Sequence, residues 1–90
     1  MVSIFENLIN IARERKTKPV QGSYTNKLLS NRSLCKEKVL EEVNELIEAV
    51  EKDTNKIHEA ADVIYHLMVF LEANDIKIED VIKELEKRKK

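Results

Sequence analysis

Two pairs of acidic residues have the types and spacing for chemistry: Glu42 with Glu45, and Glu59 with Asp62. The members of each pair are three residues apart, in segments whose apolar pattern predicts helix. Residues at this spacing share a helix face, with Cβ atoms about 5–6 Å apart, so their like charges repel. Such pairs either stay in water or hold a cation. Carboxylate oxygens bind hard divalent cations such as Mg²⁺, so the pairs predict a metal site.

The first pair belongs to a helix predicted over residues 33–52. Helical projection gives this helix an apolar stripe that we expect to face the core, and Glu42 and Glu45 border it. Glu41 and Glu48 project almost opposite the stripe, where exposed charge is usual. The stripe consists of Val39, Val43, Leu46, Ile47 and Val50.

The second pair belongs to a helix predicted over residues 56–73, which is apolar on nearly all sides. Glu59, Asp62 and His66 cluster within about 60° of arc on one side. A helix that is apolar all round is buried, so we expect this helix to be central and partly covered by a second subunit. Unpaired charge in such a place is costly, which favours a bound counter-charge. The main apolar face consists of Ile57, Ala60, Ala61, Ile64, Leu67, Met68 and Leu71.

The whole pattern predicts an all-α chain, with residues 1–90 as one domain of the four-helix bundle type. Helices are expected over residues 3–15, 33–52, 56–73 and 79–87, and a short helical turn ends at Leu29. Ser23 is expected to cap the short turn, and Ser33 to cap the helix that follows. Pro19 and Gly22 mark a loop between the first helix and the turn.

Composition narrows the classes of function. Hydrophobic residues make up 42% and charged residues 37% of the 90 residues, as in a helical globular protein. A net charge of −1 gives no electrostatic case for nucleic acid binding. The most apolar stretch, residues 63–71, is too short to span a bilayer, so no membrane association is expected. The single Cys35 and the lack of a secretory signal pattern favour a reducing, cytoplasmic setting.

The acidic residues also carry a resemblance. Glu41-Glu42-x-x-Glu45 followed by Glu59-x-x-Asp62 resembles the signature of the all-α nucleoside triphosphate pyrophosphatases, the MazG-like superfamily. The segments 22–25 (Gly-Ser-Tyr-Thr) and 59–66 make the chain similar, over nearly its whole length, to the phosphoribosyl-ATP pyrophosphohydrolase family. One position departs from the family pattern, because Leu40 stands where glycine is usual.

The resemblance implies an activity and a metal. Members of this family hydrolyse phosphoribosyl-ATP to phosphoribosyl-AMP and pyrophosphate, the second step of L-histidine biosynthesis, and need Mg²⁺, for which Mn²⁺ is a possible substitute. The implied subunit contributes its helices to a homodimeric bundle, and the implied partner is a small nucleotide substrate. Glu41 or Glu42 is implied as the base that orients water. The implied metal ligands are Glu42, Glu45, Glu59 and Asp62.

Several further residues are candidates for binding the substrate. Lys38 either contacts phosphate or pairs with Glu42 one turn later. His66 is expected to support Asp62 without binding Mg²⁺ itself, because Mg²⁺ disfavours imidazole. Arg13, Arg15 and Lys16 either reach the phosphate of the phosphoribosyl group or favour the C-terminal end of their helix. The segment expected to bind phosphate, ribose or base contributes Ser23, Tyr24, Thr25 and Lys27.

Two other functions remain open from the sequence. A housekeeping MazG-like pyrophosphatase acting on non-standard nucleotides would share the metal site and differ in its base pocket. A non-enzymatic helical dimerisation module would use the acids only to solvate its surface, and would bind no Mg²⁺.

Overall fold

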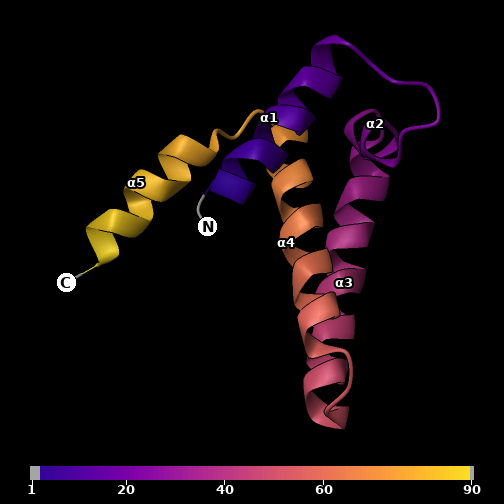
Figure 1. Cartoon of the computed structure of the whole chain (residues 1–90), viewed down its shortest axis with the longest axis vertical. Coiled ribbons are helices and arrows are strands. Elements are labelled where there is room, and N and C mark those ends of the chain that lie inside the picture. The colour runs from indigo at the N-terminus through magenta and orange to yellow at the C-terminus, as the bar shows by residue number, and fades with distance from the viewer. Residues whose placement is uncertain (1–2, 90) are drawn as a thin grey trace.

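The computed structural model describes residues 3–89, which form five α-helices and no strand (Figure 1). The predicted all-α class is confirmed. Two long antiparallel helices form a hairpin, one helix crosses the upper end of that hairpin, and the last helix projects away from it (Figure 1). Within residues 3–89, no helix has the length and apolarity that a bilayer crossing requires. The helices are α1 (Ser3–Thr17), α2 (Tyr24–Leu29), α3 (Arg32–Lys52), α4 (Lys56–Ala73) and α5 (Ile78–Arg88).

Side-chain caps set where the helices around the site begin. Ser23 caps α2 as predicted, because its Oγ accepts a hydrogen bond from the backbone N–H of Asn26 at 3.2 Å. The predicted cap of α3 is wrong: Asn31, not Ser33, accepts the N–H of Leu34 through its Oδ1 at 3.1 Å. Asparagine caps as well as serine does, and Asn31 comes first in the chain. The helix therefore starts at Arg32 and contains Ser33 in its first turn.

The side chain of Asn26 stabilises the loop before α2 through two hydrogen bonds. Its Oδ1 accepts the backbone N–H of Val20 at 2.8 Å, and its Nδ2 donates to the carbonyl of Arg15 at 2.8 Å. Gly22 has φ of +82°, a left-handed conformation that glycine adopts without steric cost. These contacts fix the path from the end of α1 to Ser23, and so position the first turn of α2.

The core lies where α2, α3 and α4 meet. Leu28, Cys35 and Val69 are fully or almost fully buried there, and Tyr65 and Phe70 pack against them. Burial raises the pKa of the Cys35 thiol above its ordinary value, so the thiol stays protonated and behaves as a small apolar group. This core holds α2 against the C-terminal half of α4, at the end of the hairpin where α3 begins.

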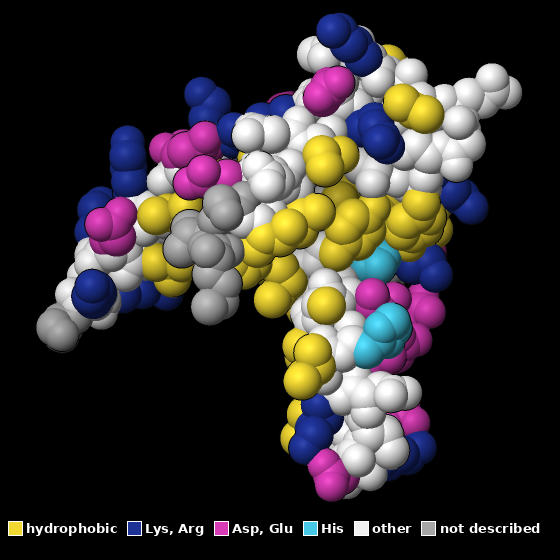
Figure 2. Space-filling view, in the orientation of Figure 1, with side chains coloured by type: hydrophobic (Ala, Val, Ile, Leu, Met, Phe, Trp, Pro, Cys, Tyr) yellow, Lys and Arg dark blue, Asp and Glu magenta, His cyan; other side chains and the backbone are white. Residues whose placement is uncertain are grey.

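The apolar stripe of α3 does not face α4. Its residues Val43, Ile47 and Val50 are exposed, and the buried side of α3 is instead centred on Cys35 and Glu42. The expectation that the stripe faces the core is therefore wrong within one chain. Much of the predicted face of α4 is exposed too. Figure 2 shows hydrophobic side chains along one edge of the hairpin and acidic and histidine side chains along the other. The exposed stripe comprises Leu40, Val43, Ile47 and Val50 of α3 with Ile57, Ile64 and Leu67 of α4.

Ion pairs join α1 to the end of α4 and to α5. Arg13 donates two hydrogen bonds to the carboxylate of Glu79, at 2.9 and 2.6 Å, and one to buried Glu72 at 3.2 Å. Lys16 donates to the carbonyl of Glu72 and to the carboxylate of Asp75, both at 2.8 Å. Arg13 and Lys16 thus have structural partners that neither sequence alternative anticipated.

Stability should fall in acid because of this cluster. Hydrogen bonds from Arg13 lower the pKa of Glu79 from 4.5 to about 2. A group whose pKa is depressed in the folded state contributes stability above its unfolded pKa and loses it as pH falls through the folded value. The Tm advantage of the wild type over Glu79→Gln should therefore be full at pH 6 and shrink between about pH 4.5 and pH 2. Calorimetry at several pH values measures it, and a difference that stays constant would contradict the assignment.

Candidate metal centre

The four predicted acidic residues come together between α3 and α4. Glu42 is buried, at 8% exposure, and faces the carboxylates of Glu45 and Asp62. Glu59, from α4, faces Glu45 of α3. One carboxylate oxygen each of Glu41, Glu42 and Glu45 lie within 4.8 Å of one another. The side chains therefore converge across the two helices instead of spreading into solvent.

The carboxylates make one another costly to ionise. Burial raises the pKa of Glu42 above its ordinary value, and the neighbouring Glu45 and Asp62 raise it further. Burial also raises the pKa of Glu59, and Glu45 and Asp62 add to that effect. Like charges gathered in a partly enclosed place disfavour the charged form, and a divalent cation among them would offset this.

Two carboxylate oxygens in this cluster have no partner. Oε2 of Glu42 and Oε2 of Glu59 are buried and accept no hydrogen bond from any of residues 3–89. Buried polar atoms in native proteins almost always have a partner, so each exception needs an explanation. An all-oxygen donor set with unpaired anionic atoms fits Mg²⁺ or Mn²⁺, which take carboxylate oxygens as ligands.

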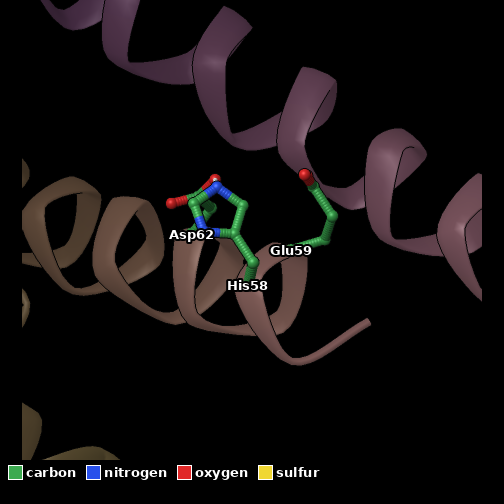
Figure 3. Close-up of side chains that lie close together, drawn as sticks. All are labelled: His58, Glu59 and Asp62. Atoms are coloured by element: carbon green, nitrogen blue, oxygen red, sulfur yellow. Dashed lines mark ion pairs between the residues drawn. The ribbon is translucent and has the colours of Figure 1, made fainter. Parts of the chain in front are cut away.

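His58 also belongs to this site, and sequence reasoning missed it. Figure 3 shows His58, Glu59 and Asp62 rising together from α4, with Glu59 reaching toward α3. One possible ligand atom from each of the three residues lies within 4.8 Å of the others. His58 Nε2 is 3.3 Å from Asp62 Oδ2, and the histidine side chain is 71% exposed. Its position four residues before Asp62 on the same helix could have indicated that the two side chains are neighbours.

His66 connects α2 to the acidic cluster through both of its ring nitrogens. Its Nδ1 lies 2.7 Å from the backbone carbonyl of Asp62, which can only accept, so Nδ1 donates. Nε2 lies 2.8 Å from the hydroxyl of Tyr24, within hydrogen-bond distance. The expected support of Asp62 is therefore present at its backbone and not at its carboxylate. Thr25 Oγ1 lies 2.5 Å from the hydroxyl of Tyr65, a residue for which packing alone was expected.

The remaining predicted substrate-binding residues lie around this junction. Ser23 Oγ accepts a hydrogen bond from Arg15 at 2.7 Å, and Ser23, Tyr24 and Lys27 line an open pocket. Lys38 Nζ lies 3.4 Å from Glu41, so the predicted pairing with Glu42 is replaced by pairing one residue earlier. No contact in the described chain tests whether these residues bind substrate, and those roles stay predictions.

The fold and the cluster together define an all-α protein whose carboxylates, gathered between two antiparallel helices, could hold a cation. The model of the family described as phosphoribosyl-ATP pyrophosphohydrolase matches residues 5–89. The chain belongs to this family, which confirms the predicted resemblance and, with it, the enzyme class.

Three relatives illustrate the similarity. The chain is 47% identical to a phosphoribosyl-ATP pyrophosphatase of Clostridium acetobutylicum, over 94% of this chain and 80% of the relative. It is 38% identical to one of Methanococcoides burtonii, over 98% and 94% respectively. It is also 43% identical to the histidine biosynthesis bifunctional protein HisIE of Pyrococcus furiosus, over 99% of this chain but only 43% of the relative.

The repulsion among the carboxylates predicts a stabilising substitution. In chelator, Glu42→Gln should raise Tm, because it removes one buried like charge and keeps the side-chain shape. Each kcal/mol of repulsion relieved is worth about 4–8 °C in a domain of this size. Thermal unfolding in EDTA measures the change.

The control for this substitution is Glu51→Gln, which changes an exposed glutamate elsewhere on α3 and should leave Tm unchanged. With Mg²⁺ present the order should reverse, since the variant then lacks a ligand. A lower Tm for Glu42→Gln than for the wild type in EDTA would show that the cluster is not repulsive.

Proposed function

We propose that this chain hydrolyses phosphoribosyl-ATP to phosphoribosyl-AMP and pyrophosphate, the second step of L-histidine biosynthesis, in a Mg²⁺-dependent reaction. The family match over residues 5–89 and the names of the relatives support the substrate. The observation that carries the metal dependence is the pair of buried, unpartnered oxygens on Glu42 and Glu59. Hydrolysis of the α–β phosphoanhydride accounts for both products.

Glu42, Glu45, Glu59 and Asp62 would hold the cation, which is Mg²⁺ or its substitute Mn²⁺. When bound, the cation neutralises the charge of the polyphosphate and of the transition state. Without it, these carboxylates repel the anionic substrate. The acids thus make nucleotide binding conditional on metal, which separates this site from an ordinary solvated helix face.

Glu41 is the residue best placed to act as the base. It is exposed beside the metal-binding carboxylates, and its own carboxylate is held by Lys38 at 3.4 Å. Glu41 would accept the proton of the attacking water, which leaves Glu42 free to bind the cation. Cys35 is buried with its pKa raised, so the thiol is unsuited to act as a nucleophile, and water attacks the phosphoanhydride directly. A buried free thiol also fits the cytoplasm.

The first turn of α2 would bind the remainder of the substrate. Ser23, Tyr24 and Lys27 line one open pocket. Burial raises the pKa of Tyr24, and the nearby positive charge of Lys38 offsets part of that rise. The hydrogen bonds of Tyr24 to His66 and of Thr25 to Tyr65 tie this turn to the metal-binding helix. Lys27 and Lys38 would bind phosphate, and the tied turn would keep Lys27 at a fixed distance from the acids.

Glu59→Gln should abolish most activity without unfolding the chain. Glutamine is similar in shape but lacks the charge that holds the cation, so the rate of pyrophosphate release with Mg²⁺ should fall on the order of 100-fold or more, as even partners of metal ligands cost about 10–100-fold. Glu51→Gln is the matched control and should retain the rate. Unchanged activity in Glu59→Gln would contradict the proposed metal site.

The same assay separates the two pyrophosphatase functions. Phosphoribosyl-ATP, dUTP and dCTP are compared, each with Mg²⁺. Phosphoribosyl-ATP should be turned over with the highest kcat/KM. Turnover of only the free nucleotides would instead identify a housekeeping pyrophosphatase with the same metal centre.

The exposed stripe supports a homodimer as the working form. Seven large aliphatic residues of α3 and α4 are exposed in the single chain, including Ile57 at 88% and Val50 at 58%. Figure 2 shows hydrophobic side chains along one edge of the hairpin, opposite the acidic side chains. Contiguous exposed apolar surface of this kind marks an interaction site, and a second copy of the same stripe is a self-complementary occupant.

Ile64→Glu should convert the dimer to a monomer, because pairing of the stripes would bury an unpaired charge. Sedimentation velocity measures the change in mass, and far-UV circular dichroism verifies that the helices remain. Val20→Glu is the control, since Val20 is an exposed aliphatic residue in the loop before α2, away from the stripe. A wild-type chain that sediments as a monomer would contradict the proposed dimer.

A further inference from the structure

We infer that His58 is a ligand that selects the cation: its Nε2 binds the same divalent ion as Asp62 and Glu59, at the exposed rim of the acidic site. A nitrogen donor there favours Co²⁺, Zn²⁺ and similar ions over Mg²⁺. The inference deepens the proposed function and rests on it, because it requires that the acidic site holds a divalent cation.

The spacing of the donor atoms suits a shared ion. Nε2 of His58 and Oδ2 of Asp62 are 3.3 Å apart. Two adjacent ligands, each about 2.1 Å from one ion, are separated by about 3.0 Å in octahedral and about 3.4 Å in tetrahedral geometry. The observed separation lies between these values, so both atoms can bind one ion almost without moving. A Glu59 oxygen lies within 4.8 Å of both, and a small side-chain rotation brings it into range.

His58 is the histidine with a nitrogen available to this site. The chain has two histidines, and both ring nitrogens of the other, His66, are within hydrogen-bond distance of Tyr24 or of the Asp62 carbonyl. Within the described residues, the one ion pair of His58 joins its Nε2 to the Asp62 carboxylate. The His58 side chain is 71% exposed. His58 can therefore add an imidazole by giving up only its contact with Asp62, whereas His66 would have to break a hydrogen bond to Tyr24 or to the Asp62 carbonyl.

A buried glutamate shows that this cluster is more than a solvated acidic face. Glu42 is over nine-tenths buried, and its Oε2 has no partner among residues 3–89. The charge of Asp62, whose carboxylate His58 contacts, helps to raise the pKa of Glu42, so the two acids lie near each other. A cation held among these carboxylates would give the unpaired oxygen of Glu42 a partner.

The chemistry of the donors sets the direction of selectivity. Carboxylates suit Mg²⁺ and Mn²⁺, whereas imidazole suits Zn²⁺, Ni²⁺ and Cu²⁺, and affinity rises from Mn²⁺ through Co²⁺ to Cu²⁺. Mg²⁺ gains little from imidazole, so His58 should leave its affinity nearly unchanged. Cys35 is buried and cannot serve as a rival soft ligand.

The test compares the wild type with His58→Gln, using Mg²⁺ and Co²⁺ as probes in isothermal titration calorimetry. We expect the variant to lose about 10–100-fold in Co²⁺ affinity, with Mg²⁺ affinity changed by less than about twofold. Glu51→Gln is the matched control and should bind both ions as the wild type does. Proton NMR of the Co²⁺-loaded wild type should show a strongly shifted imidazole N–H resonance that His58→Gln lacks.

The outcomes separate this inference from the proposed function. The inference is overturned if His58→Gln binds Co²⁺ as tightly as the wild type or keeps the shifted imidazole resonance. His58 then only pairs with Asp62 at the surface, and the proposed metal site is unaffected. If the wild type binds neither ion, the proposed metal dependence falls, and the inference falls with it.

Discussion

The mutual repulsion of four carboxylates between α3 and α4 is the constraint on which the rest of the structure depends. A hairpin that turns Glu42, Glu59 and their neighbours toward each other loses stability at its centre. The remaining contacts must hold the two helices together against that repulsion. The buried core of Leu28, Cys35 and Val69 does so at one end of the hairpin, where α2 packs across both helices.

The same constraint explains how the hairpin divides its edges. Val43, Ile47 and Ile64 are aliphatic residues of the kind that usually fill a core, yet they lie outside the contact between α3 and α4. The carboxylates occupy part of that contact instead. The acidic edge and the apolar edge are opposite each other in Figure 2. One edge therefore presents acidic side chains, and the other presents exposed apolar side chains. α1 and α5 brace this arrangement through Arg13, which pairs with Glu72 and Glu79.

Local signals in the sequence predicted the helices well. The helix over residues 56–73 agrees with α4 at both ends, and Ser23 caps α2 as expected. The convergence of the acids followed from spacing along two neighbouring helices. Four features did not follow. The first is the exposed apolar stripe of α3, which helical projection placed against the core. Asn31 caps α3 in place of Ser33, which lies two residues later. Arg13 pairs with Glu72, 59 positions away, and periodicity along the sequence cannot reveal such a contact. His58 was overlooked because a lone exposed histidine carries no signal until the fold places Asp62 and Glu59 beside it.

The anomalous signal of a crystal soaked in Mn²⁺ tests the cation site most directly. We expect a peak between α3 and α4, with oxygens of Glu42, Glu45, Glu59 and Asp62 at about 2.0–2.2 Å, close to the distances of Mg²⁺. Saturating Mn²⁺ that leaves this position without a peak, or that binds only at other acidic surfaces, would contradict it.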